Sequence, residues 1–270
     1  MRTLVHLSDI HFGHVDYATI VPLIATVRQI KPDVVVISGD LTQRARTEQF
    51  REARTFLSAL PTPQIVVPGN HDVPLYNIFA RFFSPLRRYR RYITNDLQPL
   101  YLDDEIAVLG LNTARSLTIK DGRVNQEQIA IIRRRLCPLG DSVISVLVTH
   151  HPFDLPEGSG GDTVGRSRQA MEMLAECGVD LLLSGHLHVT RTAARYVGTE
   201  HSTILVQAGT ATSTRGRGES NSFNVLRIEQ SDIAIERWSW ESQQSVFSVF
   251  SKEHFRRTQS GWEKKGVLPP

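Results

Sequence analysis

The chain has 270 residues, a formal net charge of +3 and a pI near 9.0, so it can bury a sizeable core as one large domain or two small ones. Its share of apolar residues, 40%, is ordinary for a soluble globular protein. No apolar run approaches the roughly 20 residues that span a bilayer, and the first residues read as a strand instead of a signal peptide. Because Cys137 and Cys177 lie in separate predicted helical segments, we expect no disulfide framework and a cytoplasmic location.

Short β-branched runs alternate with helical segments through the first two-thirds of the chain. Runs that are apolar on both faces belong in sheets that are covered on both sides. The predicted strands here are Thr3–Ser8, Asp33–Ser38, Gln64–Pro68, Ile106–Leu111, Ser142–Thr149 and Val179–Ser184. The predicted helices are Tyr17–Ile30, Thr47–Ala59, a basic stretch from about Leu75 to Ile93, Asn125–Arg135 and Ser167–Glu176.

After Gly185 the pattern changes to β-strands joined by turns, so parallel pairing should give way to antiparallel or mixed pairing. The predicted strands of this part are Arg191–Val197, Ser202–Gln207, Ser222–Glu229 and Ile233–Trp240. Residues 242–270 are polar and basic, and we expect a tail packed on the surface, with Phe255 and Trp262 as anchors. The expected organisation is therefore one domain over residues 1–241, followed by this tail.

Five polar clusters follow five of the predicted strands. They are Asp9-Ile10-His11, Gly39-Asp40, Gly69-Asn70-His71-Asp72, His150-His151-Pro152 and Gly185-His186-Leu187-His188. Each alone has an ordinary explanation, such as a helix cap, a turn or a buried core histidine. In open α/β sheets, however, ligands bind at the carboxyl ends of strands, and five clusters at five such ends point to one site.

The residue types in these clusters indicate metal ions. Mixed oxygen and nitrogen ligands suit Mn²⁺, Fe or Zn²⁺, and the absence of thiolates argues against a closed structural zinc site. Seven ligands are too many for one such ion and about right for two that share a bridging carboxylate.

These motifs, in this order and spacing, resemble the calcineurin-like metallophosphoesterase superfamily over about residues 1–215. The resemblance implies an α/β (α+β) fold, a four-layer αββα sandwich of two mixed sheets flanked by helices. It implies that Asp40 bridges two metal ions, Mn²⁺ or Fe with Zn²⁺ as an alternative. One ion would take Asp9, His11, Asp40 and His188, and the other would take Asp40, Asn70, His150 and His186.

The same resemblance implies a phosphoesterase mechanism. Two adjacent cations clamp a phosphate oxygen and lower the pKa of a bridging water, and the resulting hydroxide attacks phosphorus. His71 lies outside the ligand pattern, so we expect it to bind the phosphoryl oxygen or protonate the leaving group. Asp72 would hold the His71 ring in the right tautomer. For His151, a hydrogen-bonding role and a functional role both stay open.

The opening Ser-Asp-Ile-His and Gly-Asp-Leu-Thr runs resemble the bacterial branch that includes class III cyclic-nucleotide phosphodiesterases. This implies a small anionic phosphodiester substrate, and Arg215 and Arg217 are candidates to bind it. UDP-2,3-diacylglucosamine pyrophosphatase-like or phosphomonoesterase activity is the alternative. A non-catalytic metal-binding scaffold is a further alternative from a different class, although every ligand position and His71 are present.

The stretch 81–91 is basic with interleaved aromatics. We expect a solvated helix face whose aromatics pack on the core. Contact with a membrane surface, a lipid-linked substrate or nucleic acid are the alternatives, but we expect no stable nucleic-acid complex. The oligomeric state stays open.

Overall fold

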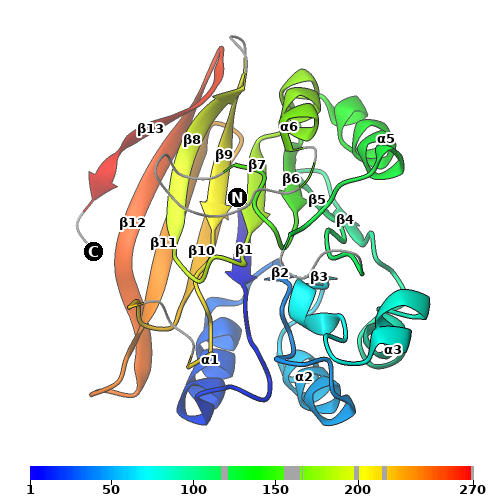
Figure 1. The fold of residues 1–270 in the computed structure, drawn as a ribbon. Coiled ribbons are helices and arrows are strands. Elements are labelled where there is room, and N and C mark those ends of the chain that lie inside the picture. Colours follow the sequence, from blue (N-terminus) through cyan, green and yellow to red (C-terminus); the bar gives the residue numbers. More distant parts are fainter. Residues whose placement is uncertain (117–120, 155–164, 166, 198–200, 215–217, 269–270) are drawn as a thin grey trace.

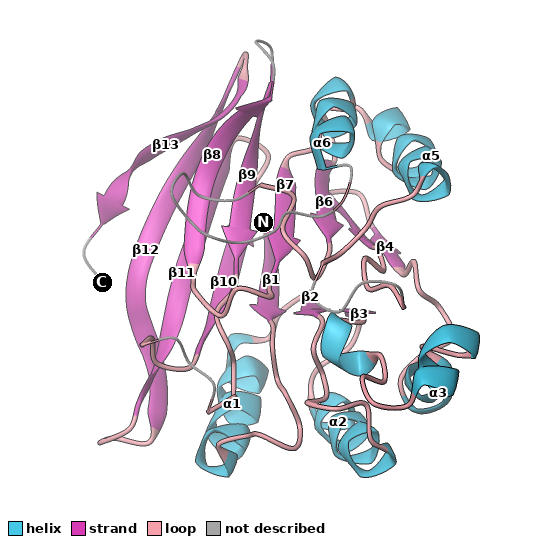
Figure 2. Cartoon of the chain, viewed as in Figure 1, coloured by secondary structure: helices cyan, strands magenta, loops and turns pink. Residues whose placement is uncertain are grey.

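The computed structural model describes the chain except residues 117–120, 155–164, 166, 198–200, 215–217 and 269–270. Two groups of strands face each other across an apolar core, and helices cover their outer faces (Figures 1 and 2). This arrangement confirms the expected four-layer sandwich.

The first group of strands runs in the order β3–β2–β1–β10–β11–β12–β13. β1, β2 and β3 pair in parallel, and from β1 onward each pair is antiparallel, as the change of pattern predicted. The bounds are β1 Arg2–Leu7, β2 Val34–Ser38, β3 Gln64–Val67, β10 Ser222–Ile228, β11 Asp232–Glu241, β12 Val246–Thr258 and β13 Gly261–Leu268.

The second group runs β9–β7–β6–β5–β4, and β8 also pairs with β9. Its bounds are β4 Leu100–Leu102, β5 Ile106–Gly110, β6 Ile144–Val148, β7 Leu181–Ser184, β8 Arg191–Val197 and β9 His201–Gln207. A single pairing, Gly261 of β13 with Ser202 of β9, joins the two groups. The two expected sheets are therefore hydrogen-bonded into one sheet that folds back on itself.

Alternating side chains along the strands separate three layers of core. In β1, Leu4 points between the two groups of strands, whereas Val5 and Leu7 point outward to the helices. Helices α1 (Tyr17–Ile30) and α2 (Thr47–Ala59) cover the first group, and α5 (Gln126–Arg135) and α6 (Ser167–Glu176) cover the second. The parallel strands β2, β5 and β6 are buried along their whole length, which explains their almost uninterrupted apolar sequences.

The basic helical stretch predicted from about Leu75 to Ile93 is helical only in part. The structure has two six-residue helices instead, α3 (Ile78–Phe83) and α4 (Arg87–Tyr92). Ser84 and Pro85 separate them, because proline offers no backbone donor and disfavours helical geometry in the residue before it.

The expected C-terminal tail is also corrected. Beyond residue 241 the chain forms β12 and β13, which pair antiparallel with β11 and with each other. Phe255 and Trp262 are fully buried between the two groups of strands, so they are core residues of a hairpin. The polar side chains of β12 that suggested a tail are at least partly exposed.

The two cysteines do not behave as expected either, since Cys137 and Cys177 form a disulfide. Cys137 begins a short 3₁₀ helix after α5, and Cys177 follows α6. These helices cover the same sheet face, so residues 40 apart in sequence meet. The cysteine argument for a reducing compartment therefore no longer holds. Within the described residues, no helix has the length and apolar character to cross a membrane.

Replacing Trp262 with alanine tests whether the C-terminal hairpin is part of the core. The indole is fully buried and its Nε1–H donates to Asp180 Oδ1 at 2.9 Å. We expect Trp262→Ala to lower the free energy of unfolding, measured by urea titration, by about 3–5 kcal/mol. The exposed Phe250, also in β12–β13, is the control, and Phe250→Ala should change it by less than about 1 kcal/mol. Equal, small effects would mean that the hairpin is dispensable.

Candidate metal centre

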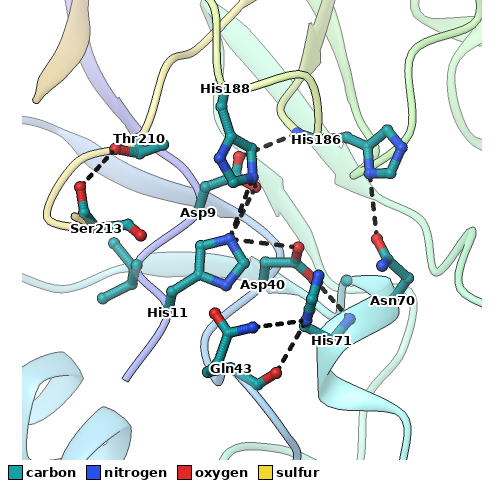
Figure 3. Close-up of polar contacts among 12 residues, drawn as sticks. Asp9, His11, Asp40, Gln43, Asn70, His71, His186, His188, Thr210 and Ser213 are labelled. Atoms are coloured by element: carbon teal, nitrogen blue, oxygen red, sulfur yellow. Dashed lines mark hydrogen bonds and ion pairs between the residues drawn. The ribbon is translucent and has the colours of Figure 1, made fainter. Parts of the chain in front are cut away.

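The five polar motifs lie directly after the carboxyl ends of five strands. Asp9 and His11 follow β1, Asp40 follows β2, and Asn70 follows β3. These strands belong to the first group. His150 follows β6, and His186 and His188 follow β7, both in the second group. The site therefore lies where the two groups of strands meet, and the seven predicted ligands come together there. Figure 3 labels six of them, all except His150.

The first set of side chains, here called the Asp9 cluster, consists of Asp9, His11, Asp40 and His188. One ligand atom from each lies within 4.8 Å of all the others. His188 Nε2 is 3.2 Å from Asp9 Oδ1 and 3.2 Å from His11 Nε2. All four are at least about nine-tenths buried, so these donor atoms converge on one point away from bulk water.

The second set, here called the Asn70 cluster, consists of Asn70, His150 and His186. Asn70 Oδ1 lies 3.1 Å from His150 Nε2 and 3.1 Å from His186 Nδ1. His150 Nδ1 lies 2.8 Å from the carbonyl oxygen of Ser38, to which it donates. In the neutral ring this leaves a lone pair on Nε2, directed at the cluster.

Asp40 lies between the two clusters. Its Oδ1 accepts a hydrogen bond from the backbone N–H of His71 at 2.8 Å. Its Oδ2 is 3.7 Å from His11 Nε2 and 3.4 Å from His150 Nε2. One carboxylate oxygen is thus held by the backbone, and the other faces one histidine of each cluster.

The charges of these groups favour ionised carboxylates at the centre of the site. Asp9 Oδ1 is completely buried and receives no hydrogen bond from the described residues, whereas Oδ2 accepts from Ser8 Oγ and from the N–H of His186. Burial alone would raise the pKa of Asp9, but His188 and His11 hold it well below its usual range. Burial would likewise lower the pKa of His150, but the Asp40 carboxylate outweighs this and raises it to about 9. The site therefore favours ionised carboxylates with positive charge beside them.

Five of the seven predicted ligands have left-handed backbone conformations. The φ angles are 53° for Asp9, 56° for His11, 49° for Asp40, 75° for His186 and 58° for His188. Such a conformation costs a non-glycine residue about 1–2 kcal/mol. Strain of this kind concentrates at functional sites, where the surrounding structure enforces it.

Two glycines allow the loops to approach each other. A Cβ on Gly69 would lie 2.1 Å from Asp40 Oδ1, and one on Gly185 would lie 1.8 Å from Ser8 Oγ and 2.6 Å from Asp9 Oδ2. No side chain fits at either position, so these glycines are required by space rather than by backbone angle.

His71 lies beside the Asp9 cluster, with its ring centroid 5.0 Å from that of His11. Its orientation differs from the expected one. The ring Nδ1 is 2.9 Å from the carbonyl oxygen of Gln43, to which it donates, and this leaves Nε2 as the acceptor. Asp72 does not hold this ring. Its carboxylate accepts from the N–H groups of Gly69, Leu41 and Thr42 and from the Thr42 hydroxyl.

Asp72 therefore organises the loops that carry Asp40 and Asn70. Burial, together with the Asp40 charge, raises its pKa to about 6. Sequence reasoning missed Gln43 and Ser38 because each acts through a backbone carbonyl, which any residue type supplies. His151 Nδ1 lies 2.8 Å from Thr113 Oγ1, and its ring centroid is 4.7 Å from that of His186. The candidates Arg215 and Arg217 lie outside the described residues.

Comparison with known families agrees with this geometry. The family model described as calcineurin-like phosphoesterase matches residues 2–190, well over half of the chain. The chain belongs to the calcineurin-like phosphoesterase family. All seven predicted ligands and His71 lie within the matched range.

Several bacterial phosphodiesterases are similar in sequence. Glycerophosphodiester phosphodiesterase GpdQ from Enterobacter lignolyticus is 31% identical over 166 residues, 56% of this chain and 58% of that protein. A probable cyclic nucleotide phosphodiesterase from Synechococcus sp. is 29% identical over 60% of each chain. The cAMP/cGMP dual specificity phosphodiesterase MT0825 from Mycobacterium tuberculosis is 27% identical over 83% of this chain and 75% of that protein. The match thus spans somewhat over half the length of the first two relatives.

Among solved structures, purple acid phosphatase PPD1 from yellow lupin has a TM-score of 0.66 at 16% identity, over 94% of this chain and 53% of that one. At this level of identity the likeness concerns the fold alone.

Replacing Gly69 with alanine tests the close approach of the loops. The added methyl group would overlap the Asp40 carboxylate, so we expect Gly69→Ala to weaken manganese binding by about 10–100-fold, as other changes behind metal ligands do. Isothermal titration calorimetry would measure it. Gly165→Ala is the control, because its Cβ would meet nothing closer than 3.5 Å. Equal affinities in the two variants would contradict the geometry described here.

Proposed function

We propose that this protein is a dinuclear metal-dependent phosphodiesterase that acts on small phosphodiesters, cyclic nucleotides among them. The observation that carries the proposal is the position of Asp40, with Oδ2 within 3.7 Å of His11 Nε2 and 3.4 Å of His150 Nε2. A carboxylate in this place can hold two cations side by side.

In this proposal the Asp9 cluster holds one ion, and the Asn70 cluster together with Asp40 holds the other. Carboxylate, amide and imidazole ligands without thiolates favour Mn²⁺ or Fe, with Zn²⁺ as the alternative. Two such ions supply Lewis acidity to a phosphate oxygen and activate a water molecule for attack on phosphorus. The protein contributes the fixed donor positions and the exclusion of bulk water.

We assign to His71 a direct role with the substrate. It belongs to neither cluster, and it lies beside His11 with Nδ1–H committed to the Gln43 carbonyl. When protonated, Nε2 can donate to a phosphoryl oxygen or give its proton to the departing alkoxide. The carbonyl of Gln43, and not the carboxylate of Asp72, fixes the ring for either task.

The names of the relatives support a diester substrate. Glycerophosphodiester and cyclic-nucleotide phosphodiesterases share the cleavage of one P–O bond in a phosphodiester, and both kinds occur among the similar proteins. The diester class, rather than one member of it, is therefore our proposal for this chain.

A substrate panel tests the proposed reaction. After treatment with a chelator and dialysis, the protein should be inactive, and Mn²⁺ should restore hydrolysis of bis-p-nitrophenyl phosphate and cyclic AMP. Rates on p-nitrophenyl phosphate and UDP-2,3-diacylglucosamine should be far lower. Turnover of the monoester alone would exclude a phosphodiesterase, and bound metal without turnover of any ester would favour a scaffold.

Replacing His71 separates a substrate role from a ligand role. We expect His71→Ala to lower kcat on bis-p-nitrophenyl phosphate by about 100- to 10,000-fold, the usual contribution of a general acid, while metal content measured by atomic emission stays unchanged. His14, an exposed histidine three residues after His11, is the control, and His14→Ala should keep wild-type kcat. Loss of one metal equivalent in His71→Ala would show that His71 is a ligand.

A further inference from the structure

Helix α3 buries its charged side chain and exposes its large apolar ones, the reverse of the usual arrangement at a water-facing surface. Its charged residue, Arg81, is 6% exposed, whereas Phe79 is 78% and Phe83 83% exposed. Ile78 and Phe82, also exposed, lie on the same side, because residues one turn apart share a helix face. The prediction that the aromatics of this stretch pack on the core is therefore wrong for α3.

Hydrogen bonds to backbone carbonyls hold Arg81 in its inward position. Its Nε donates to the carbonyl oxygen of Ser116 at 2.7 Å, and Nη1 donates to that of Pro74 at 3.1 Å. The guanidinium thus docks α3 on the protein through backbone carbonyls. The apolar side of α3 therefore faces outward, and the rings of Phe79 and Phe83 stack there at a centroid distance of 6.4 Å.

The exposed apolar residues form one continuous segment, here called the α3 patch. Half of the large apolar side chains that are exposed in the described part of the chain belong to it. The patch consists of Leu75, Tyr76, Ile78, Phe79, Phe82 and Phe83. Apolar patches of this kind mark surfaces that bind a partner or a membrane.

The charge around the α3 patch identifies the kind of partner. From Val73 to Asn95 the sequence contains five arginines and no carboxylate. Arg87, Arg90 and Arg115 line a hollow of about 450 Å³. Ser84, which follows Phe83 of the patch in sequence, lines it too. None of the side chains around this hollow is acidic.

Aromatic side chains next to arginines suit the boundary between lipid tails and phosphate headgroups. A second copy of the chain is a poorer fit, because a symmetric contact would bring two arginine-rich segments together. We therefore infer that the α3 patch docks on an anionic membrane surface, with Arg87, Arg90 and Arg91 at the phosphates.

The location of the patch gives this contact a consequence for the site. Leu75 follows His71 by four residues, and Tyr76 contacts Arg44, the neighbour of Gln43, through its ring and its hydroxyl. Docking would therefore place the metal centre next to the headgroup layer.

Vesicle flotation with the full chain tests the inference. We expect the protein to float with vesicles of phosphatidylcholine and phosphatidylglycerol and far less with phosphatidylcholine alone, and to detach as salt rises. The double variant F79S/F83S should partition at least about tenfold more weakly, since it removes two apolar anchors. The control is Phe250→Ser, which changes an exposed phenylalanine of β12 and should float like the wild type.

The arginines are tested separately. R87Q/R91Q should lose the preference for anionic vesicles, whereas R134Q/R135Q, two exposed arginines of α5, should keep it. Failure of the wild-type protein to bind anionic vesicles at low salt would overturn the inference. A dimer in sedimentation velocity that F79S/F83S converts to monomer would overturn it too, because a second copy would then cover the patch.

The variants F79S/F83S and R87Q/R91Q should both hydrolyse bis-p-nitrophenyl phosphate in solution at the wild-type rate, which would show that they are folded. Vesicle binding and hydrolysis are independent readouts. A protein that floats without hydrolysing contradicts only the proposed function, and one that hydrolyses without floating contradicts only the membrane contact.

Discussion

The site depends on one carboxylate, that of Asp40, being held at the junction of two groups of strands. The backbone N–H of His71 fixes one of its oxygens, and the other faces histidines carried by different strands. This requires the ends of β2 and β6 to meet, which the folding of the sheet around its inner core accomplishes. The sandwich therefore serves to bring two separate sets of strand ends to one carboxylate.

Close approach of so many polar groups is unfavourable without a compensating charge. Burial raises the energy of the ionised Asp9 and Asp40 carboxylates, and the carboxylates of Asp40 and Asp72 repel each other. The left-handed conformations of five of the predicted ligand residues add about 1–2 kcal/mol each. Part of this cost is met by fixed hydrogen bonds, such as that from Ser8 to Asp9. The remainder is what a bound cation would offset, so the site has the energetic character of one built around metal ions.

The sequence predicted most of the parallel strands, because their runs are apolar on both faces, and it predicted which residues gather at their ends. It failed where tertiary packing overrode local pattern. Residues 246–268 look polar, yet a buried Phe255 and Trp262 make them strands of the core. Cys137 and Cys177 meet only because two helices share a sheet face. The left-handed conformations could not be predicted, since Asp and His rather than glycine occupy those positions.

Two buried charged side chains, Asp72 and Arg81, are each explained by their hydrogen-bond partners. Asp72 is a buried charged residue, and the backbone N–H groups that donate to its carboxylate explain its position between the loops. Arg81 is also charged and buried, and its carbonyl partners account for its position as well. These partners do not explain the opposite side of α3, where phenylalanines face water. Exposing these apolar side chains is unfavourable, and no contact within the described residues offsets it. A buried charge with satisfied partners is explained by the fold, whereas an exposed apolar face beside arginines supports the inferred contact with a membrane surface.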